Sequence, residues 1–554
     1  MRLLSLALCL GLLSLPIASA GEEPAPETTE PTPAESVTPP PSNPDAPLLN
    51  GTLALTLEDA IEMGLENNLD VKVERYAPVI AEYDEAIAWG AYDPEIFSEF
   101  GYSDRQTPNA NVLFGTRENV NRSTDGFGGL RGVLPLLSTE YSGQFDGARR
   151  TTNNAIQALS PEYTSGWSLN LSQPLLRDLI WNQPWTQVQT SRLLMQSSRE
   201  DFRRSVMDTV SSIEDAYWAL IANDEGRRVA QKSLETARAL LDQTKTQFEV
   251  GVVSKVEVTE AEAGLSEREV NLIRAENQYR NQQDVLIDLV LGPGLRSNST
   301  LEIAPADRPE EYVPYTIDVP TAVERAFEHR PELESAQKQI ERQQVQLKFA
   351  KNQRLPALDG IFGFGQSGLS GDKNSDFDPC RFSSDPACDP LDPALDPSQG
   401  GFSKSRRDYS DNPTFLARAR FSVPFPNTAA RKNVSRTDLE LRRARTLKQR
   451  LEQSIILEVR RAARNLEASQ EAIDAARAAE RAAQEQLRAE RIRLEYGEST
   501  PFDVLQRERD LVDRENELIG AFQAYRTSVT ALDRAQGTIL RNRNIKIAEV
   551  SPLR

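Results

Sequence analysis

The chain alternates between long segments with helical periodicity and short segments with strand periodicity. Within residues 188–220, apolar side chains recur at intervals of 7, 4 and 3, which is typical of helices packed along their length. These residues are Val188, Met195, Phe202, Val206, Val210, Ile213, Tyr217 and Leu220. Residues 427–496 contain neither glycine nor proline, and a continuous helix of that length would extend about 105 Å. On their own, these segments would indicate a solvated coiled coil.

Four shorter segments have the period-two alternation that is typical of β-strands. The alternation is strict in residues 167–172 and 415–423 and weaker in residues 96–103 and 358–365. One face of each strand is apolar or aromatic and the other is polar or small, as in outer-membrane barrels. A soluble antiparallel sheet with one solvated face would give the same pattern. Because the smallest membrane barrels need eight strands, four membrane strands would have to share a barrel with other subunits.

The order of these segments repeats within the chain. Three pairs of segments resemble each other at separations of 262, 250 and 246 residues, namely 57–68 with 319–330, 169–174 with 419–424, and 248–258 with 494–504. Two copies of one unit account for a length of 554 residues that could otherwise suggest three or four domains. We predict a first structural repeat at residues 51–300 and a second at residues 301–545, each with a helix, two strands and long helices.

The amino-terminal 50 residues have neither periodicity. Residues 1–20 combine Arg2, an apolar run and the small residues Ala18, Ser19 and Ala20, which is the pattern of a cleaved secretory signal peptide. Residues 21–50 follow as an acidic tether. Residues 21–47 contain nine prolines and no basic residue, so they bury too little apolar surface to fold. We therefore expect an exported protein with a disordered amino-terminal tether.

Two long polar segments separate the predicted strands, at residues 105–164 and 371–413. The second contains Cys380 and Cys388, the two cysteines that remain after removal of the signal peptide. An oxidising compartment favours a disulfide between them. In the first segment, residues 127–146 have a weak pattern for a further hairpin, which could either join a barrel or stand above it.

Composition excludes several classes of function. The 64 basic and 83 acidic residues give a net charge of −19, which disfavours nucleic-acid binding because phosphates require a basic surface. One histidine and three cysteines offer neither a set of metal ligands nor a His-containing catalytic pair. The sequence has no glycine-rich phosphate loop of the usual spacing and no Gly-x-Ser-x-Gly motif, so we expect no enzymatic activity, metal or cofactor.

The repeated segments resemble those of the TolC-type outer-membrane efflux proteins. The resemblance covers residues 55–540 and is carried by the segments beginning at Leu57 and Val319, by residues 171–177, and by the turn motifs beginning at Gly251 and Gly497. It implies a mainly α fold with a membrane β-barrel. Long helices would form a tapering tunnel, and four strands per subunit would close a 12-stranded barrel in a homotrimer.

The resemblance also implies a location and partners. The protein would lie in the outer membrane of a Gram-negative bacterium, in contact with its lipid, with the tunnel in the periplasm. A periplasmic adaptor and an inner-membrane transporter would dock at the closed end of the tunnel. The chain would then be the passive exit duct of a tripartite efflux or type I secretion system. A periplasmic coiled-coil scaffold without a pore is the alternative, although it gives no reason for aromatic strands.

Candidate gate residues follow from the same resemblance. Gly251 and Gly497 would lie at the periplasmic tip, where the long helices reverse. In the family, an aspartate pair after the second turn narrows the tunnel mouth. The first aspartate falls on Asp503, and the second falls on Gln506, which departs from the pattern. Two further positions in the first repeat are equivalent to these, Glu257 and Glu260.

The closed-state latch of the family has different residues in this chain. The arginine and tyrosine that form the latch fall on Ser499 and Leu494. Neither side chain can form the ionic or phenolic contacts of the family's residues. Three-fold symmetry would turn Asp503 into a ring of like charges, which repel one another unless counter-ions or protons intervene.

Overall fold

The computed structural model describes residues 50–108, 118–308, 314–407 and 412–547, apart from residues 136, 155, 293–299, 376 and 378–399. The expected signal peptide, nearly all of the tether and the Cys380–Cys388 disulfide lie outside the described residues. The first half of the described chain contains β1 (Asn50–Leu55), α1 (Leu57–Asn67), α2 (Leu69–Trp89), η1 (Gly90–Tyr92), β2 (Glu95–Pro108), β3 (Glu118–Val133), β4 (Glu140–Thr152), β5 (Leu159–Pro174), α3 (Gln183–Glu249) and α4 (Lys255–Leu291). The second half contains β6 (Thr300–Pro305), α5 (Val319–His329), α6 (Pro331–Gln353), β7 (Ala357–Lys373), α7 (Phe402–Arg407), β8 (Pro413–Ser422), α8 (Thr428–Glu495), α9 (Pro501–Gln536) and α10 (Ile539–Asn542).

The two halves repeat the same plan in space as well as in sequence. β1 pairs with β6 in parallel, and every pair of Cα partners is 250 residues apart. The last long helix of each copy is followed by a glycine with positive φ, 49° at Gly292 and 73° at Gly537. A Cβ at Gly292 would lie within 3 Å of the backbone oxygen of Asn67, at the end of α1. A Cβ at Gly537 would lie within 3 Å of the backbone oxygen of His329, at the end of α5. Glycine at these two positions therefore permits both the turn and the close approach.

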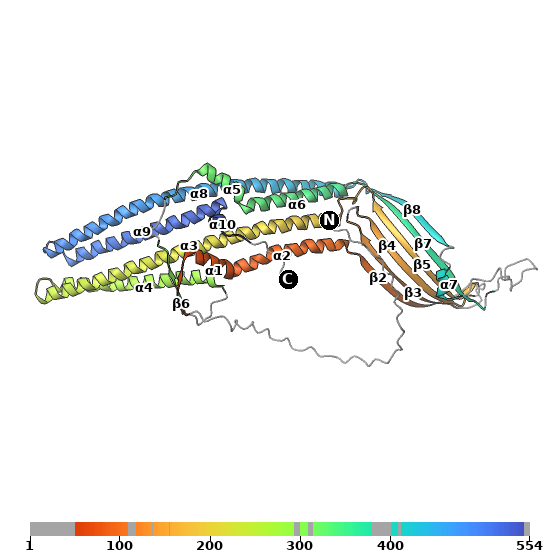
Figure 1. Cartoon of the computed structure of the whole chain (residues 1–554), viewed down its shortest axis with the longest axis horizontal. Coiled ribbons are helices and arrows are strands. Elements are labelled where there is room, and N and C mark those ends of the chain that lie inside the picture. The colour runs from red at the N-terminus through yellow and green to blue at the C-terminus, as the bar shows by residue number, and fades with distance from the viewer. Residues whose placement is uncertain are drawn as a thin grey trace, which may run out of the picture. The chain divides into compact units, whose positions relative to one another are not determined.

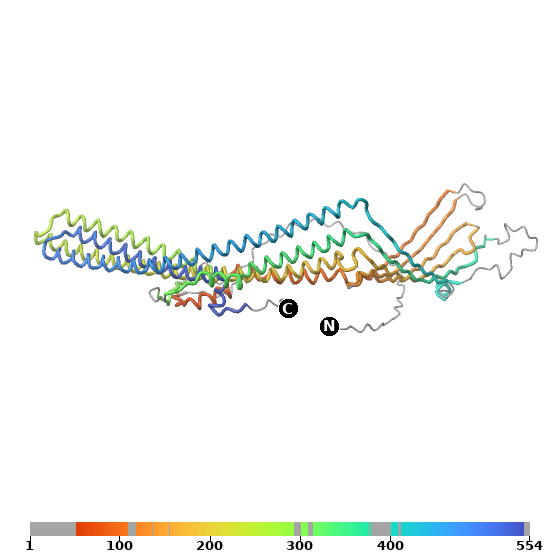
Figure 2. The backbone as a smooth tube through the Cα atoms, turned by 90° about the horizontal axis from the view of Figure 1, so that it is seen from above, coloured from red at the N-terminus to blue at the C-terminus, as the bar shows by residue number. Residues whose placement is uncertain are grey.

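The long helices follow the sequence pattern closely. α3 and α8 have 67 and 68 residues, so each extends roughly 100 Å. The uninterrupted helix predicted for residues 427–496 is confirmed as α8. The apolar stripe of α3 is buried except at Met195, which is half-buried. α3–α4 and α8–α9 form two hairpins, and α3 also packs against α9 (Figures 1 and 2).

The described strands outside β1 and β6 form one sheet of six strands, in the order β2-β3-β4-β5-β7-β8. All neighbours in this sheet are antiparallel. The prediction of four strands per subunit is therefore wrong. The two additional strands, β3 and β4, come from the segment at residues 105–164 that was expected to be a loop. Residues 127–146 lie in this hairpin and join the sheet between β2 and β5.

Glycine explains why the sequence pattern concealed β3. On the face where β2 carries Phe100, the paired residue of β3 is Gly126, and two residues farther along β3 is Gly128. A strand with glycine at its apolar positions has no hydrophobic period-two signal. The missing side chains are replaced by neighbours, since a Cβ at Gly126 would meet Phe100 at 3.3 Å and Phe145 of β4 lies opposite Gly128.

The register gives the sheet two chemically different faces. One face is apolar across all six strands, and its exposed side chains include Ile96, Phe100, Tyr102, Leu130, Phe145, Leu169, Leu171, Phe362, Phe364, Phe415 and Phe421. The opposite face carries mainly charged, polar and small side chains, among them Glu95, Glu99, Arg131, Gln144, Asn170, Arg418 and Arg420. We call these the apolar face and the polar face of the sheet.

The elements are arranged so that helices and strands meet end to end. In Figure 1 the helical hairpins extend from one end of the six-stranded sheet, and their reversals lie at the far end from the strands. α7 lies at the opposite end of the sheet, beside β5 and β7. β2 and β8 are the two edges, and neither pairs with a second strand within the described part of the chain.

Candidate channel gate and helix junction

The two helix reversals have the same backbone geometry. Gly251, between α3 and α4, has φ 77°, and Gly497, between α8 and α9, has φ 74°. Each glycine N–H donates to a carbonyl of the preceding helix, Gly251 to Phe248 at 3.0 Å and Gly497 to Leu494 at 3.1 Å. The following N–H of each turn donates one residue farther back along the helix. This pattern satisfies the last carbonyls of a helix that ends at a left-handed residue.

The next helix begins with an acid that caps it in both repeats. In the second repeat, the Thr500 and Asp503 side chains each bond the other's backbone N–H, at 3.2 and 3.3 Å, and the Thr500 hydroxyl donates to Asp503 Oδ2 at 2.7 Å. In the first, the Ser254 N–H donates to Glu257 Oε2 at 2.5 Å. Both pairs form capping boxes, which bond N–H groups that a helix start leaves free.

Asp503 is thus both a helix cap and an exposed charge at the tip. The hydrogen bonds from Thr500 lower the pKa of the Asp503 carboxyl, because they stabilise its ionised form. Gln506 is exposed and accepts a hydrogen bond from Arg509 Nη1 at 3.3 Å. Glu260 is exposed one turn beyond Glu257 on α4. Within one chain, these four candidate residues lie at two separate tips and do not form a cluster.

An apolar contact surrounds Leu494, one of the two positions expected to correspond to the family's latch. Leu494 is half-buried against a cluster that joins α3, α8 and α9, formed by Leu240, Leu487, Val504 and Leu505. Ser499 donates a hydrogen bond of 2.5 Å to Glu490 Oε1, on α8. The contacts at this tip are therefore apolar packing between the two repeats and one hydrogen bond within the second repeat.

A buried pair of charges beyond the tip was not found from the sequence. Arg268 of α4 and Glu508 of α9 are each 4% exposed, and Arg268 lines a groove of about 570 Å³ between α3, α4 and α9. Burial raises the pKa of Glu508, while Arg268 and Arg491 oppose the rise. Arg268 Nε and Glu508 Oε2 have no hydrogen-bond partner among the described residues. Acids and arginines are frequent all along these helices, so the sequence does not single this pair out.

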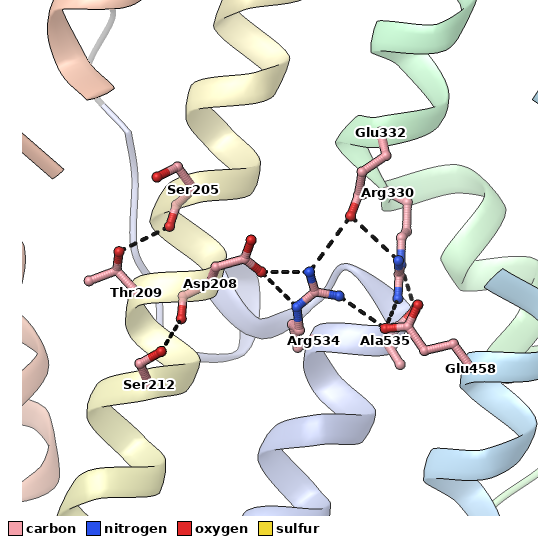
Figure 3. Close-up of polar contacts among 9 residues, drawn as sticks. All are labelled: Ser205, Asp208, Thr209, Ser212, Arg330, Glu332, Glu458, Arg534 and Ala535. Atoms are coloured by element: carbon pink, nitrogen blue, oxygen red, sulfur yellow. Dashed lines mark hydrogen bonds and ion pairs between the residues drawn. The ribbon is translucent and has the colours of Figure 1, made fainter. Parts of the chain in front are cut away.

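A larger group of charges joins four helices near the start of α6 (Figure 3). Arg534 of α9 donates from Nε to Asp208 of α3 at 2.7 Å and from Nη1 to Glu458 of α8 at 3.0 Å. Arg330 Nη2 lies 2.6 Å from the same Glu458, as an ion pair without hydrogen-bond geometry. Glu332 of α6 lies 3.4 Å from Arg330 Nη1. We call these five residues the charged junction.

Arg330 has a counterpart in the first repeat. Its guanidinium donates from Nε to the backbone oxygen of Ala535 at 2.9 Å, near the end of α9. At the equivalent position, 262 residues earlier, the Asn68 side chain donates to the backbone oxygen of Leu289 at 3.1 Å, near the end of α4. Both side chains tie the start of a short helix to the end of the last long helix of their repeat. Arg330 does so at 3% side-chain exposure, with its charge balanced by the junction acids.

This architecture defines a class of protein. Long antiparallel helices that continue into a sheet with one apolar and one polar face are the arrangement of outer-membrane channels with a helical tunnel. The chain belongs to the outer membrane efflux protein family, whose model matches residues 132–290 and 322–538. The resemblance deduced from the duplicated segments is thereby confirmed, and the protein is an outer-membrane efflux protein.

Solved channels have the same fold at low sequence identity. The CmeC outer-membrane channel of Campylobacter jejuni is 17% identical, with a TM-score of 0.61, and the match covers 87% of this chain and 86% of that one. MtrE of Neisseria gonorrhoeae, in its open state, is 16% identical, with a TM-score of 0.59 and coverage of 87% and 89%. VceC of Vibrio cholerae is 15% identical, with a TM-score of 0.58 and coverage of 87% and 96%. A search of curated proteins finds no match to the chain.

Two further observations concern only the described residues. None of their helices is long and apolar enough to cross a membrane. None of their His, Cys, Asp and Glu side chains form a group of three or more that could hold a metal ion.

Proposed function

We propose that the chain is the outer-membrane exit duct of a tripartite efflux or secretion system, passing its cargo from the periplasm to the outside without consuming energy itself. The observation that carries this proposal is the two-faced sheet joined end to end with paired helical hairpins. Its apolar face suits lipid, and its polar face suits a water-filled lumen. A scaffold without a pore would leave exposed aromatic side chains such as Phe100 and Phe415, 79% and 73% exposed, without a role.

Closure of the barrel requires more than one copy. β2 and β8 run antiparallel to each other, because an antiparallel sheet of six strands begins and ends with opposite directions. β8 of one copy can therefore pair with β2 of the next in the same antiparallel manner. In a homotrimer, three copies of this sheet would close an 18-stranded barrel in place of the 12 strands that the family resemblance implied.

The tips of the helical hairpins suit a docking partner. Both reversals carry exposed apolar side chains, with Val250, Val252 and Tyr496 at 71%, 72% and 79% exposure. Apolar side chains clustered at a protruding tip are typical of protein interaction sites. We infer that these tips bind a periplasmic adaptor that links the duct to an inner-membrane transporter. Asp503 at the same tip would form a ring of carboxylates around the tunnel mouth in a trimer.

Single-channel recording tests the duct directly. The purified protein should produce discrete, ion-conducting steps in planar lipid bilayers. Absence of conductance from protein that elutes as a trimer would contradict the pore. Docking needs a separate test in intact cells, with a photo-crosslinking residue at Val252 and a control at Tyr76 of α2, which is 54% exposed. A crosslink to a periplasmic adaptor from the Val252 variant alone supports docking at the tip, and equal capture from both positions contradicts it.

A further inference from the structure

α7 is fixed on the apolar face of the sheet. Ser405, which is fully buried, donates from Oγ to the Gly368 carbonyl at 2.7 Å. It lies 2.5 Å from Ser165 Oγ on the neighbouring strand. A Cβ at Gly368 would lie 1.8 Å from the backbone oxygen of Ser405, so the close approach of α7 to β7 requires glycine there. These buried contacts hold α7 in a fixed position on the surface of the sheet.

α7 lies near the end of the strands that is remote from the helices, where the apolar side chains of the apolar face give way to polar ones. Phe402, the first residue of α7, packs edge-on against Tyr163 with ring centroids 5.0 Å apart. Tyr163 lies in a row that crosses the sheet on the apolar face and includes Tyr102, Thr124, Arg149 and Ser370. Tyrosines at such a level are typical of the boundary between lipid tails and headgroups. This boundary is the one remote from the helices, because α7 lies at that end of the sheet (Figure 1).

Three arginines lie either on α7 or in the row of Tyr163, whose ring Phe402 of α7 contacts. Arg406 and Arg407 end the helix and are exposed. Arg149 of β4 is exposed on the apolar face, directly opposite Tyr163. None of the three forms an ion pair with another described residue. Near the end of β7 the carboxylate of Asp372 is exposed, so among the described residues the three guanidinium groups outnumber it.

Position and charge together specify a ligand. A guanidinium at the rim of a lipid-facing surface can keep its donors in the headgroup layer and bind phosphate with two parallel hydrogen bonds. Clusters of basic side chains at a membrane surface bind anionic lipid headgroups. We propose that α7 and Arg149 form a binding site for the phosphate groups of an outer-leaflet glycolipid such as lipid A. The site is on β4, β5 and β7, away from the edge strands, so neighbouring copies would leave it open to lipid.

The inference requires that the apolar face meets lipid, but it does not depend on which transporter uses the duct. The test uses the full chain in detergent, titrated with lipid A that carries two phosphates and with the same lipid after removal of both phosphates. The variant is Arg406→Gln/Arg407→Gln. The matched control is Arg418→Gln/Arg420→Gln, which removes two exposed arginines from the polar face of β8.

Loss of two charges is expected to weaken binding of the phosphorylated lipid about 30-fold, because each charge contributes about fivefold and the two factors multiply. The control variant and the lipid without phosphate should show no such difference. Arg149→Gln, which leaves α7 untouched, should weaken binding about fivefold. Single-channel conductance of the α7 and Arg149 variants, which change the face away from the lumen, should equal that of the parent, so failure of the site and failure of the duct are distinguishable.

Three outcomes would overturn the proposal. The first is unchanged lipid binding by both the α7 variant and the Arg149 variant. The second is an equal loss in the polar-face control, which would indicate nonspecific attraction of charge. The third is inorganic phosphate binding as tightly as the phosphorylated lipid, which would mean that the site recognises a soluble anion and not a lipid.

Discussion

Removal of the β3–β4 hairpin should narrow the barrel without opening it. Deletion of residues 118–152 leaves β2 to pair with β5, and these strands also run in opposite directions. The register places Ile96 of β2 at the same level as Leu169 of β5, with both side chains on the apolar face. The shortened sheet would therefore keep one apolar and one polar face, with four strands per copy.

The size of the change follows from strand geometry. With strands about 4.8 Å apart and tilted by about 40°, 18 strands enclose a barrel of roughly 36 Å between backbones and 12 strands one of roughly 24 Å. Polyethylene glycols of increasing size, added on the barrel side of a planar bilayer, report this width because they reduce the current only if they enter. The parent should admit distinctly larger polymers than the deletion variant. An identical size limit in the two, with both eluting as intact trimers, would refute the assignment of β3 and β4 to the barrel wall.

Three further perturbations test individual side chains. Asp503→Ala removes the N3 partner of the capping box as well as the charge, and should lower helix stability and reduce cation selectivity or raise conductance. Asp503→Asn should change the current with little effect on thermal stability. An unchanged current–voltage curve in both would remove Asp503 from the gate. Arg330→Met removes the ion pairs to Glu332 and Glu458 and the hydrogen bond to the Ala535 carbonyl, so that Arg534 alone balances the junction acids. It should lower the free energy of unfolding by about 2–3 kcal/mol, measured with denaturant. By comparison, Arg228→Met removes a guanidinium that is 61% exposed and should cost less than about 1 kcal/mol. Glu508→Gln should raise the melting temperature at pH 8 but not at pH 4. The buried Glu508 carboxyl has a raised pKa and binds its proton more tightly in the folded state, so it destabilises the fold as pH rises. Equal shifts of the melting temperature at both pH values would contradict this.

The sequence predicted the elements whose signals are local. The absence of glycine and proline from residues 427–496 predicted α8. The apolar stripe at residues 188–220 predicted the buried face of α3. The turn motifs at Gly251 and Gly497 could be located because a left-handed glycine followed by a capping acid is a short pattern. The duplication was visible for the same reason, since equivalent helix starts need similar residues.

The features that could not be predicted from the sequence are β3, the charged junction and α7. The first two depend on residues that are distant along the chain. β3 has glycines where a lipid-facing strand would have apolar side chains, and only the neighbouring strands show that Phe100 and Phe145 cover them. The charged junction draws Asp208 from α3, Arg330 from between α5 and α6, and Arg534 from α9. None of the three stands out among 147 charged residues. α7 is six residues long, too short for helical periodicity to identify it.

The parallel pairing of β1 with β6 has a consequence for how the protein folds. The two strands are 250 residues apart, so β1 cannot find its partner until the whole first repeat has crossed the inner membrane. Closing so long a loop is slow, because its entropic cost is met before any pairing stabilises it. During that interval the edges of β1 are available to other chains. The amino-terminal strand of this channel is thus open to unwanted pairing until the second repeat reaches it.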